Sequence, residues 1–154
     1  MGFFYYICIL TILKMNNLII KRSQLVEAQF TGTVAVGKKY AFTQVPNISR
    51  NNIIIYGFEV FTATQLATTP SNNTVIPANA APNVVITFVD ENNVERIYQI
   101  PYSALIASAN GGFIRMVKPF ILNLTKSYVQ CVSTSNISTD QVASVNLYYS
   151  IVGE

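Results

Sequence analysis

Residues 83–101, NVVITFVDENNVERIYQIP, set the fold class of this chain. β-Branched and aromatic residues dominate both ends of the stretch, and such residues favour pleated, partly buried strands. Between the ends lies the polar sequence DENN at 90–93, in which asparagine tolerates a positive φ. The stretch therefore predicts a β-hairpin whose two strands are joined by a tight primed turn.

The outgoing strand of this hairpin, 84–89, is apolar on both faces. One face is expected to cover the core, and the other to be covered by a second layer or a neighbouring subunit. The turn contains four side chains whose oxygen atoms could coordinate a cation: Asp90, Glu91, Asn92 and Asn93. The turn lacks the ligand spacing and the glycine of an EF-hand loop, so we interpret it as a solvated hairpin tip.

The rest of the chain repeats the pattern of short apolar strands between Gly, Pro and Asn. Strands are expected at residues 30–36, 40–45, 52–61, 113–118, 120–124, 127–134 and 144–152, and a helical turn at 103–108. Gly57 lies inside a strongly β-biased segment and indicates a bulge or a close backbone approach. In the last strand, Val145, Leu147, Tyr149 and Ile151 are predicted to share one face.

This pattern predicts an all-β fold, an antiparallel β-sandwich or jelly roll of about eight strands with an N-terminal arm. We expect residues 1–27 to form the arm and residues 28–154 the sandwich domain. The arm contains the apolar run 3–13, FFYYICILTIL, which is shorter than the roughly 20 residues of a membrane-spanning helix. Three interpretations of this run stay open: an ordered or membrane-contacting arm, a secretory signal or anchor, and a false start with translation from Met15.

Composition points to a surface that other molecules cover. The chain is 51% hydrophobic and only 11% charged, whereas an ordinary soluble domain has about 25% charged residues. A surface built mainly from Asn, Ser, Thr and Gln suits a subunit enclosed by its neighbours, or a secreted protein. The net charge of +3 is weak, so no specific nucleic-acid partner is expected.

The sequence excludes most catalytic centres. It contains no histidine, which removes Ser-His-Asp, Cys-His and histidine–metal sites within one chain. Cys8 and Cys131 are the only cysteines, too few for a zinc cluster, and we interpret them as buried free thiols. Glu59, Glu91 and Glu95 offer only a thin basis for paired-carboxylate chemistry. We therefore expect no enzymatic activity, no cofactor, no metal and no small-molecule substrate.

The segment 65–83, QLATTPSNNTVIPANAAPN, is expected to be an ordered contact loop. It holds three prolines and no charged residue, and loops of this length in compact domains are usually functional or disordered. The absence of charge favours a surface that is covered by another subunit. The residues that we predict to make subunit contacts are Pro70, Val75, Ile76, Pro77 and Pro82.

Several of these features together resemble small virion proteins of the single jelly-roll type, as in tailless bacteriophage capsids. They are a short N-terminal arm, the FTGTVAV segment and its hairpin at 30–45, the uncharged loop 65–83, and the final strand VNLYYSIV at 145–152. The resemblance covers residues 28–152. It implies a capsid, penton or decoration subunit in the virion, with other copies of itself and other virion proteins as partners. It also implies that the arm reaches a neighbour or a membrane, and it implies no cofactor.

The rival hypothesis is a secreted or surface-anchored bacterial β-sandwich that binds a ligand, such as an adhesin or a carbohydrate-binding module. It requires the apolar run to act as a signal or anchor, and the aromatic residues to form an exposed platform. Because those aromatic residues alternate along predicted strands, we interpret most of them as core. The virion hypothesis predicts an oligomer, and the rival predicts a monomer.

Overall fold

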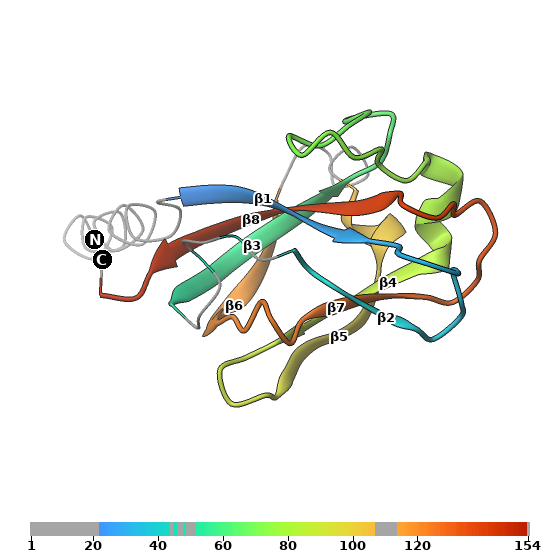
Figure 1. The fold of residues 1–154 in the computed structure, drawn as a ribbon. Helices are drawn as coiled ribbons and strands as arrows, with labels where there is room; N and C mark the ends of the chain where they lie inside the picture. Colours follow the sequence, from blue (N-terminus) through green and yellow to red (C-terminus); the bar gives the residue numbers. More distant parts are fainter. Residues whose placement is uncertain (1–21, 44, 46–47, 49–51, 107–113, 154) are drawn as a thin grey trace, which may run out of the picture.

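The computed structural model of the protein describes residues 22–43, 45, 48, 52–106 and 114–153. Within them, eight strands form two four-stranded antiparallel sheets (Figure 1). The strands are β1 (Arg22–Gln29), β2 (Lys39–Ala41), β3 (Ile53–Phe61), β4 (Val84–Val89), β5 (Glu95–Pro101), β6 (Arg115–Ile121), β7 (Tyr128–Cys131) and β8 (Val142–Ile151). Two short 3-10 helices, η1 (Ala78–Asn83) and η2 (Tyr102–Leu105), precede β4 and follow β5.

The strand order identifies the fold as a jelly roll. One sheet has the order β1-β8-β3-β6 and the other has the order β2-β7-β4-β5. The pairs β1 with β8, β2 with β7, β3 with β6 and β4 with β5 are nested, as in one long hairpin wrapped around a core. This is the connectivity of a double-sheet jelly roll. The predicted fold class is therefore confirmed.

The core lies between the two sheets and is rich in aromatic side chains. The ring of Phe88 on β4 lies 5.0 Å from that of Phe58 on β3 and 5.9 Å from that of Phe42. All six residues of β4 are buried, so the chain itself covers both faces of this strand. On β8, Val145 and Leu147 are fully buried and face the core as predicted.

The Tyr102 hydroxyl joins η2 to the first sheet. Tyr102 is fully buried, donates a hydrogen bond to the Phe61 carbonyl oxygen, and accepts one from the Ser144 N–H at 3.1 Å. Phe61 and Ser144 are paired at one end of the β3–β8 ladder. Burial raises the pKa of Tyr102 far above its ordinary value, so the hydroxyl remains a donor. The turn that follows β5 is thereby fixed to the opposite sheet.

The first strand differs from its prediction. β1 begins at Arg22, so the predicted boundary at residue 28 falls inside a strand that pairs with β8 over its whole length. The predicted strand 30–36 is wrong. The backbone of Phe30 bonds instead to residues 140 and 141, and Gly32 and Gly37 have φ values of 66° and 76°. Positive φ at two glycines breaks the extended conformation.

Two further strand boundaries are corrected. The predicted strand 40–45 is reduced to β2, at 39–41. The two strands predicted at 113–118 and 120–124 are one strand, β6, which continues through Pro119. Because β6 lies at the edge of its sheet, the missing N–H of proline removes no ladder bond that the sheet requires. The helical turn expected at 103–108 begins as η2, and residues 107 and 108 lie outside the described part of the chain.

The hairpin 84–101 is confirmed, but its turn is not a primed one. The Asp90 N–H bonds to the Val94 carbonyl at 2.8 Å, and the Asn93 N–H bonds to the Asp90 carbonyl at 3.0 Å. In this turn Asn93, with a φ of 60°, is the residue with a positive φ. This geometry is a three-residue loop that ends in a left-handed residue.

Gly57 marks a bulge, as predicted. The register of β3 shifts between Ile55 and Gly57 against both of its neighbours. A Cβ atom on Gly57 would lie 2.8 Å from Cγ2 of Ile114 and 3.0 Å from the carbonyl oxygen of Arg115. The glycine therefore permits the close approach of β6 to β3.

We expect Gly57→Ala to lower the free energy of unfolding by about 1–3 kcal/mol, because the added methyl group would displace the β6 backbone. Denaturant unfolding measures this loss. Gly37→Asn is the control: a Cβ there meets nothing within 4 Å, and asparagine tolerates a positive φ, so its midpoint should stay near wild type. A Gly57→Ala midpoint equal to wild type would contradict the close approach.

Candidate functional site

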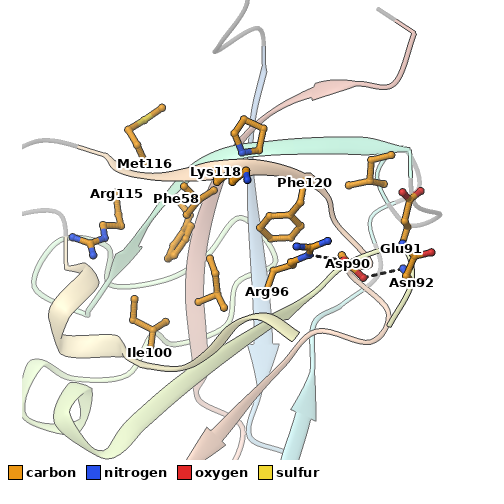
Figure 2. A pocket seen from close by; sticks show the side chains of 14 residues that line it. Phe58, Asp90, Glu91, Asn92, Arg96, Ile100, Arg115, Met116, Lys118 and Phe120 are labelled. Carbon is orange, nitrogen blue, oxygen red and sulfur yellow. Dashed lines mark hydrogen bonds and ion pairs between the residues drawn. The ribbon is translucent and has the colours of Figure 1, made fainter. Parts of the chain in front are cut away.

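A groove of about 710 Å³ lies between β5 and β6 (Figure 2). These two strands are the last strands of their respective sheets, so the groove opens where the sandwich is not closed by a further strand. At the opposite side of the sandwich, an isolated bridge between Ala28 and Phe42 connects the two sheets. The groove is larger than a second depression of about 180 Å³ described below, and we take it as the candidate site.

The groove combines an apolar lining with charged side chains. Its apolar members come from β3, β5 and β6 and are Phe58, Ile97, Ile100, Met116, Val117, Pro119, Phe120 and Ile121. Its polar members are Asp90, Glu91, Asn92, Arg96, Arg115 and Lys118. Such a surface offers both hydrophobic contact and charge recognition.

Asp90 holds one end of the groove together. Its side chain is 3% exposed. One carboxylate oxygen accepts hydrogen bonds from the N–H groups of Asn92 and Val94, each at 2.9 Å. The other accepts from Arg96 Nε at 2.6 Å. The Val94 N–H, followed by the Arg96 guanidinium, lowers the pKa of Asp90 below its usual value.

Asp90 is therefore a structural carboxylate rather than part of a solvated tip. Its hydrogen bonds fix the hairpin turn and hold Arg96 against the groove wall. In this respect the solvated-tip interpretation was wrong for Asp90, although Glu91, Asn92 and Asn93 are exposed. The aspartate is buried because the turn folds back onto the end of β6, where Asp90 forms a bridge with Leu122.

The free charges of the groove are separated along its length. Figure 2 shows Arg115 and Met116 at one end and Glu91 and Asn92 at the other. The Glu91 N–H bonds to the carbonyl oxygen of Ile121, the last residue of β6, whereas Arg115 is the first residue of that strand. Arg96 is engaged by Asp90 between the two ends. The groove is thus basic where β6 begins and acidic where it ends.

Both strands that border the groove are irregular. Between the pairs Gly57–Met116 and Ile55–Phe120, three β6 residues lie opposite one β3 residue. β5 is shifted twice against β4, and Gln99 on β5 has a φ of 49°. Bulges of this kind, together with Pro119, make an edge a poor template for an added strand. The groove therefore presents side chains rather than a regular row of backbone hydrogen-bonding groups.

The five residues predicted to contact another subunit do not form one surface. Val75 and Ile76 are fully buried in the chain itself, because this segment runs beside β8. Val75 forms a bridge with Val142, and the Ile76 N–H bonds to the Val142 carbonyl at 3.0 Å. Pro70 and Pro82 are exposed and Pro77 is half-buried. Only the three prolines therefore retain surface that another molecule could contact.

Pro70 borders a second, smaller depression of about 180 Å³. Glu27 lies beneath it, 8% exposed, and accepts a hydrogen bond from Asn73 Nδ2 at 3.0 Å. Its other carboxylate oxygen has no hydrogen-bond partner within the described residues. A carboxylate at this position fixes the turn at residues 69–73 onto β1.

The described residues include the three glutamates considered above for paired-carboxylate chemistry and one of the two cysteines. Among them, no group of three or more His, Cys, Asp or Glu side chains could hold a metal ion. Glu59 is not among the groove-lining residues and accepts a hydrogen bond from the Tyr148 hydroxyl at 2.7 Å, while Glu95 accepts one from Tyr128. Cys131 is a buried free thiol, and Cys8 lies outside the described residues.

No helix of the described residues is both long and apolar enough to cross a membrane. Comparison with protein families, with curated proteins and with solved structures finds no match to this chain. A functional proposal must therefore be argued from the fold, the surface and the groove.

The groove itself was missed by sequence reasoning. Arg96 and Arg115 lie on strands that are separated in sequence by η2 and residues 106–114, and the distance between them depends on how the two sheets close. One local signal was present: Arg115 and Lys118 lie in the predicted strand 113–118, and Pro119 follows it directly. Charged residues and proline within a strand are typical of an exposed edge.

The lowered pKa of Asp90 predicts a pH-dependent contribution to stability. Its bonds stabilise the fold above its ordinary pKa of 3.8, and this contribution is lost as the pH falls through the lower pKa of the folded state. Between about pH 6 and about pH 2.5, we expect the melting temperature of wild type to fall by more than that of Asp90→Asn, because asparagine does not titrate. Thermal unfolding at a series of pH values tests this.

Glu91→Gln is the matched control, since Glu91 is the exposed neighbour in the same turn. It should retain the pH dependence of wild type. If Asp90→Asn and wild type showed the same dependence, the hydrogen bonds to the carboxylate would not contribute as described.

Proposed function

We propose that this protein is a structural subunit of a virus particle, a capsid, penton or decoration protein that acts by assembling with copies of itself and with other virion proteins. The connectivity of its two sheets carries the proposal, since viral capsid domains are among the principal users of the double-sheet jelly roll. Lectin domains and cupins share this architecture, and a fold alone does not determine function. Surface properties must therefore distinguish these classes.

The surface favours assembly. With only 11% charged residues, the chain lacks the charge that keeps most free monomers apart in solution. Large apolar side chains are exposed on several elements, among them Val36, Val94, Tyr98, Met116, Val132 and Val152. Neighbouring subunits would remove these side chains from water, at about 25 cal/mol per Å² of apolar area. The virion would accordingly be the location of the protein.

The rival hypothesis remains a secreted or surface-anchored binding module. The groove favours it, because its volume of about 710 Å³ lies within the range of ligand pockets. Against it, the aromatic residues that line the groove are not an exposed platform: Phe58 is fully buried and Phe120 is half-buried. The two hypotheses differ in the expected state of the protein, which is oligomeric for a virion subunit and monomeric for a binding module.

The mass of the native full-length protein tests the proposal. We expect light scattering to show a closed oligomer or a larger particle, and intact mass spectrometry to show a chain that begins at Met1 or Met15. A monomer shortened after the apolar run 3–13 would contradict the proposal and support the secreted module. Electron microscopy of the same sample would show whether the assembly is closed.

A further inference from the structure

The separation of charge along the groove makes it self-complementary, which is the property of a surface that pairs with itself across a two-fold axis. In an isologous contact both subunits use the same patch. If residue i of one copy contacts residue j of the other, residue j of the first copy therefore contacts residue i of the second. Arg115 and Ile121, the ends of β6, pair with Phe58 and Ile54, which are four residues apart on β3. At roughly 3.3 Å per residue, the two ends of β6 therefore lie about 13 Å apart. If two grooves face each other with their β6 strands antiparallel, Arg115 of each copy meets Glu91 of the other.

We infer that the groove between β5 and β6 binds a second copy of this chain across a two-fold axis. This inference rests on the proposed function and specifies one contact between copies in the assembly. Two Arg115–Glu91 pairs would form, one at each end of the interface. Complementary charges fix orientation and speed encounter more than they add affinity. A parallel arrangement would instead place Arg115 against Arg115 and Glu91 against Glu91, so the charges select the antiparallel one.

The side chains between the charged ends supply hydrophobic contact. Met116 is 49% exposed, and the half-buried Ile97, Ile100, Val117 and Phe120 line the groove. Methionine and arginine are enriched at protein interfaces, and the apolar side chains would be covered at the centre of the contact. The irregular edges of β5 and β6 exclude a continuous intermolecular sheet, which leaves this side-chain contact as the mode of association.

Asp90 and Arg96 keep the acidic end of the groove in place. Because Arg96 is neutralised by Asp90 at 2.6 Å, it offers little net charge to a partner. The same hydrogen bonds hold the turn that carries Glu91 against the end of β6. The acidic end is therefore a preformed feature, and association requires little ordering of the turn.

Lys118 sets a limit on the affinity. It is the middle residue of β6 and therefore lies next to its own equivalent at the two-fold axis. Two like charges at the axis oppose association. The contact should consequently be weak between isolated copies and become stable within a larger assembly, where other contacts add to it.

Charge reversal in the full-length protein tests the inference. We expect Arg115→Glu and Glu91→Arg to weaken dimerisation about ten-fold or more in sedimentation velocity, because each creates two like-charge pairs. The double variant, R115E with E91R, should associate nearly as well as wild type, since the charge pattern is only exchanged. Lys39→Glu is the matched control: Lys39 is exposed on β2, at the far edge of the second sheet, and its reversal should leave dimerisation unchanged.

Removing the central charge gives the opposite result. We expect Lys118→Ala to tighten the dimer about three-fold or more, because the like charges at the axis disappear. Circular dichroism melting of every variant establishes that it is folded, which separates a lost contact from a lost fold. A Lys118→Ala dimer that is weaker than wild type would contradict the proposed position of the axis.

The outcomes distinguish this inference from the proposed function. If wild type forms oligomers that single reversals leave unchanged, the groove contact is wrong and the virion proposal stands. If wild type forms a reversal-sensitive dimer that never grows into a larger assembly, the contact stands and the virion proposal fails. A wild type that is monomeric at all concentrations contradicts both.

Discussion

Pairing of β8 with two partners is the constraint on which this jelly roll depends. The strand lies between β1 and β3 and pairs with both along its length, so without it β1 and β3 would not be joined in one sheet. Its partners are distant in sequence, and such long-range pairings form only after a large loss of chain entropy. Burial of Val145 and Leu147 in the core, on the same face of β8, offsets part of this loss of chain entropy. At one end of the ladder, Tyr102 adds hydrogen bonds from η2, which follows a strand of the other sheet.

The strands predicted correctly from the sequence are those whose own residue composition strongly favours a β-strand. The hairpin 84–101, the segment 52–61 with its bulge at Gly57, and the final strand are dominated by β-branched and aromatic residues. Residues 30–36 have a similar composition but form no strand, because Gly32 has a positive φ and the Phe30 backbone bonds to residues 140 and 141. Pro119 was read as a break because edge position, which permits proline, is a property of the sheet.

The groove is a feature that could not be predicted from the sequence. Its two walls belong to different sheets, and its charges come from one hairpin turn and from the two edge strands β5 and β6. Glu91 and Arg115 acquire their relation only because the turn bonds to the last residue of β6. The contact loop at 65–83 illustrates the converse error, since an uncharged segment that suggested an interface places Val75 and Ile76 in the core of its own chain. Absence of charge does not distinguish burial within a chain from burial between chains.

The irregular edges of β5 and β6 also bear on how this protein avoids misassembly. A chain with half of its residues hydrophobic and long β-strands is at risk of stacking into fibrils, in which sheets grow without limit by backbone pairing. Pro119, the bulge opposite Gly57 and the left-handed Gln99 interrupt the row of N–H and C=O groups that such growth would copy. At these two edges, copies at high concentration are hindered from extending one another's sheets.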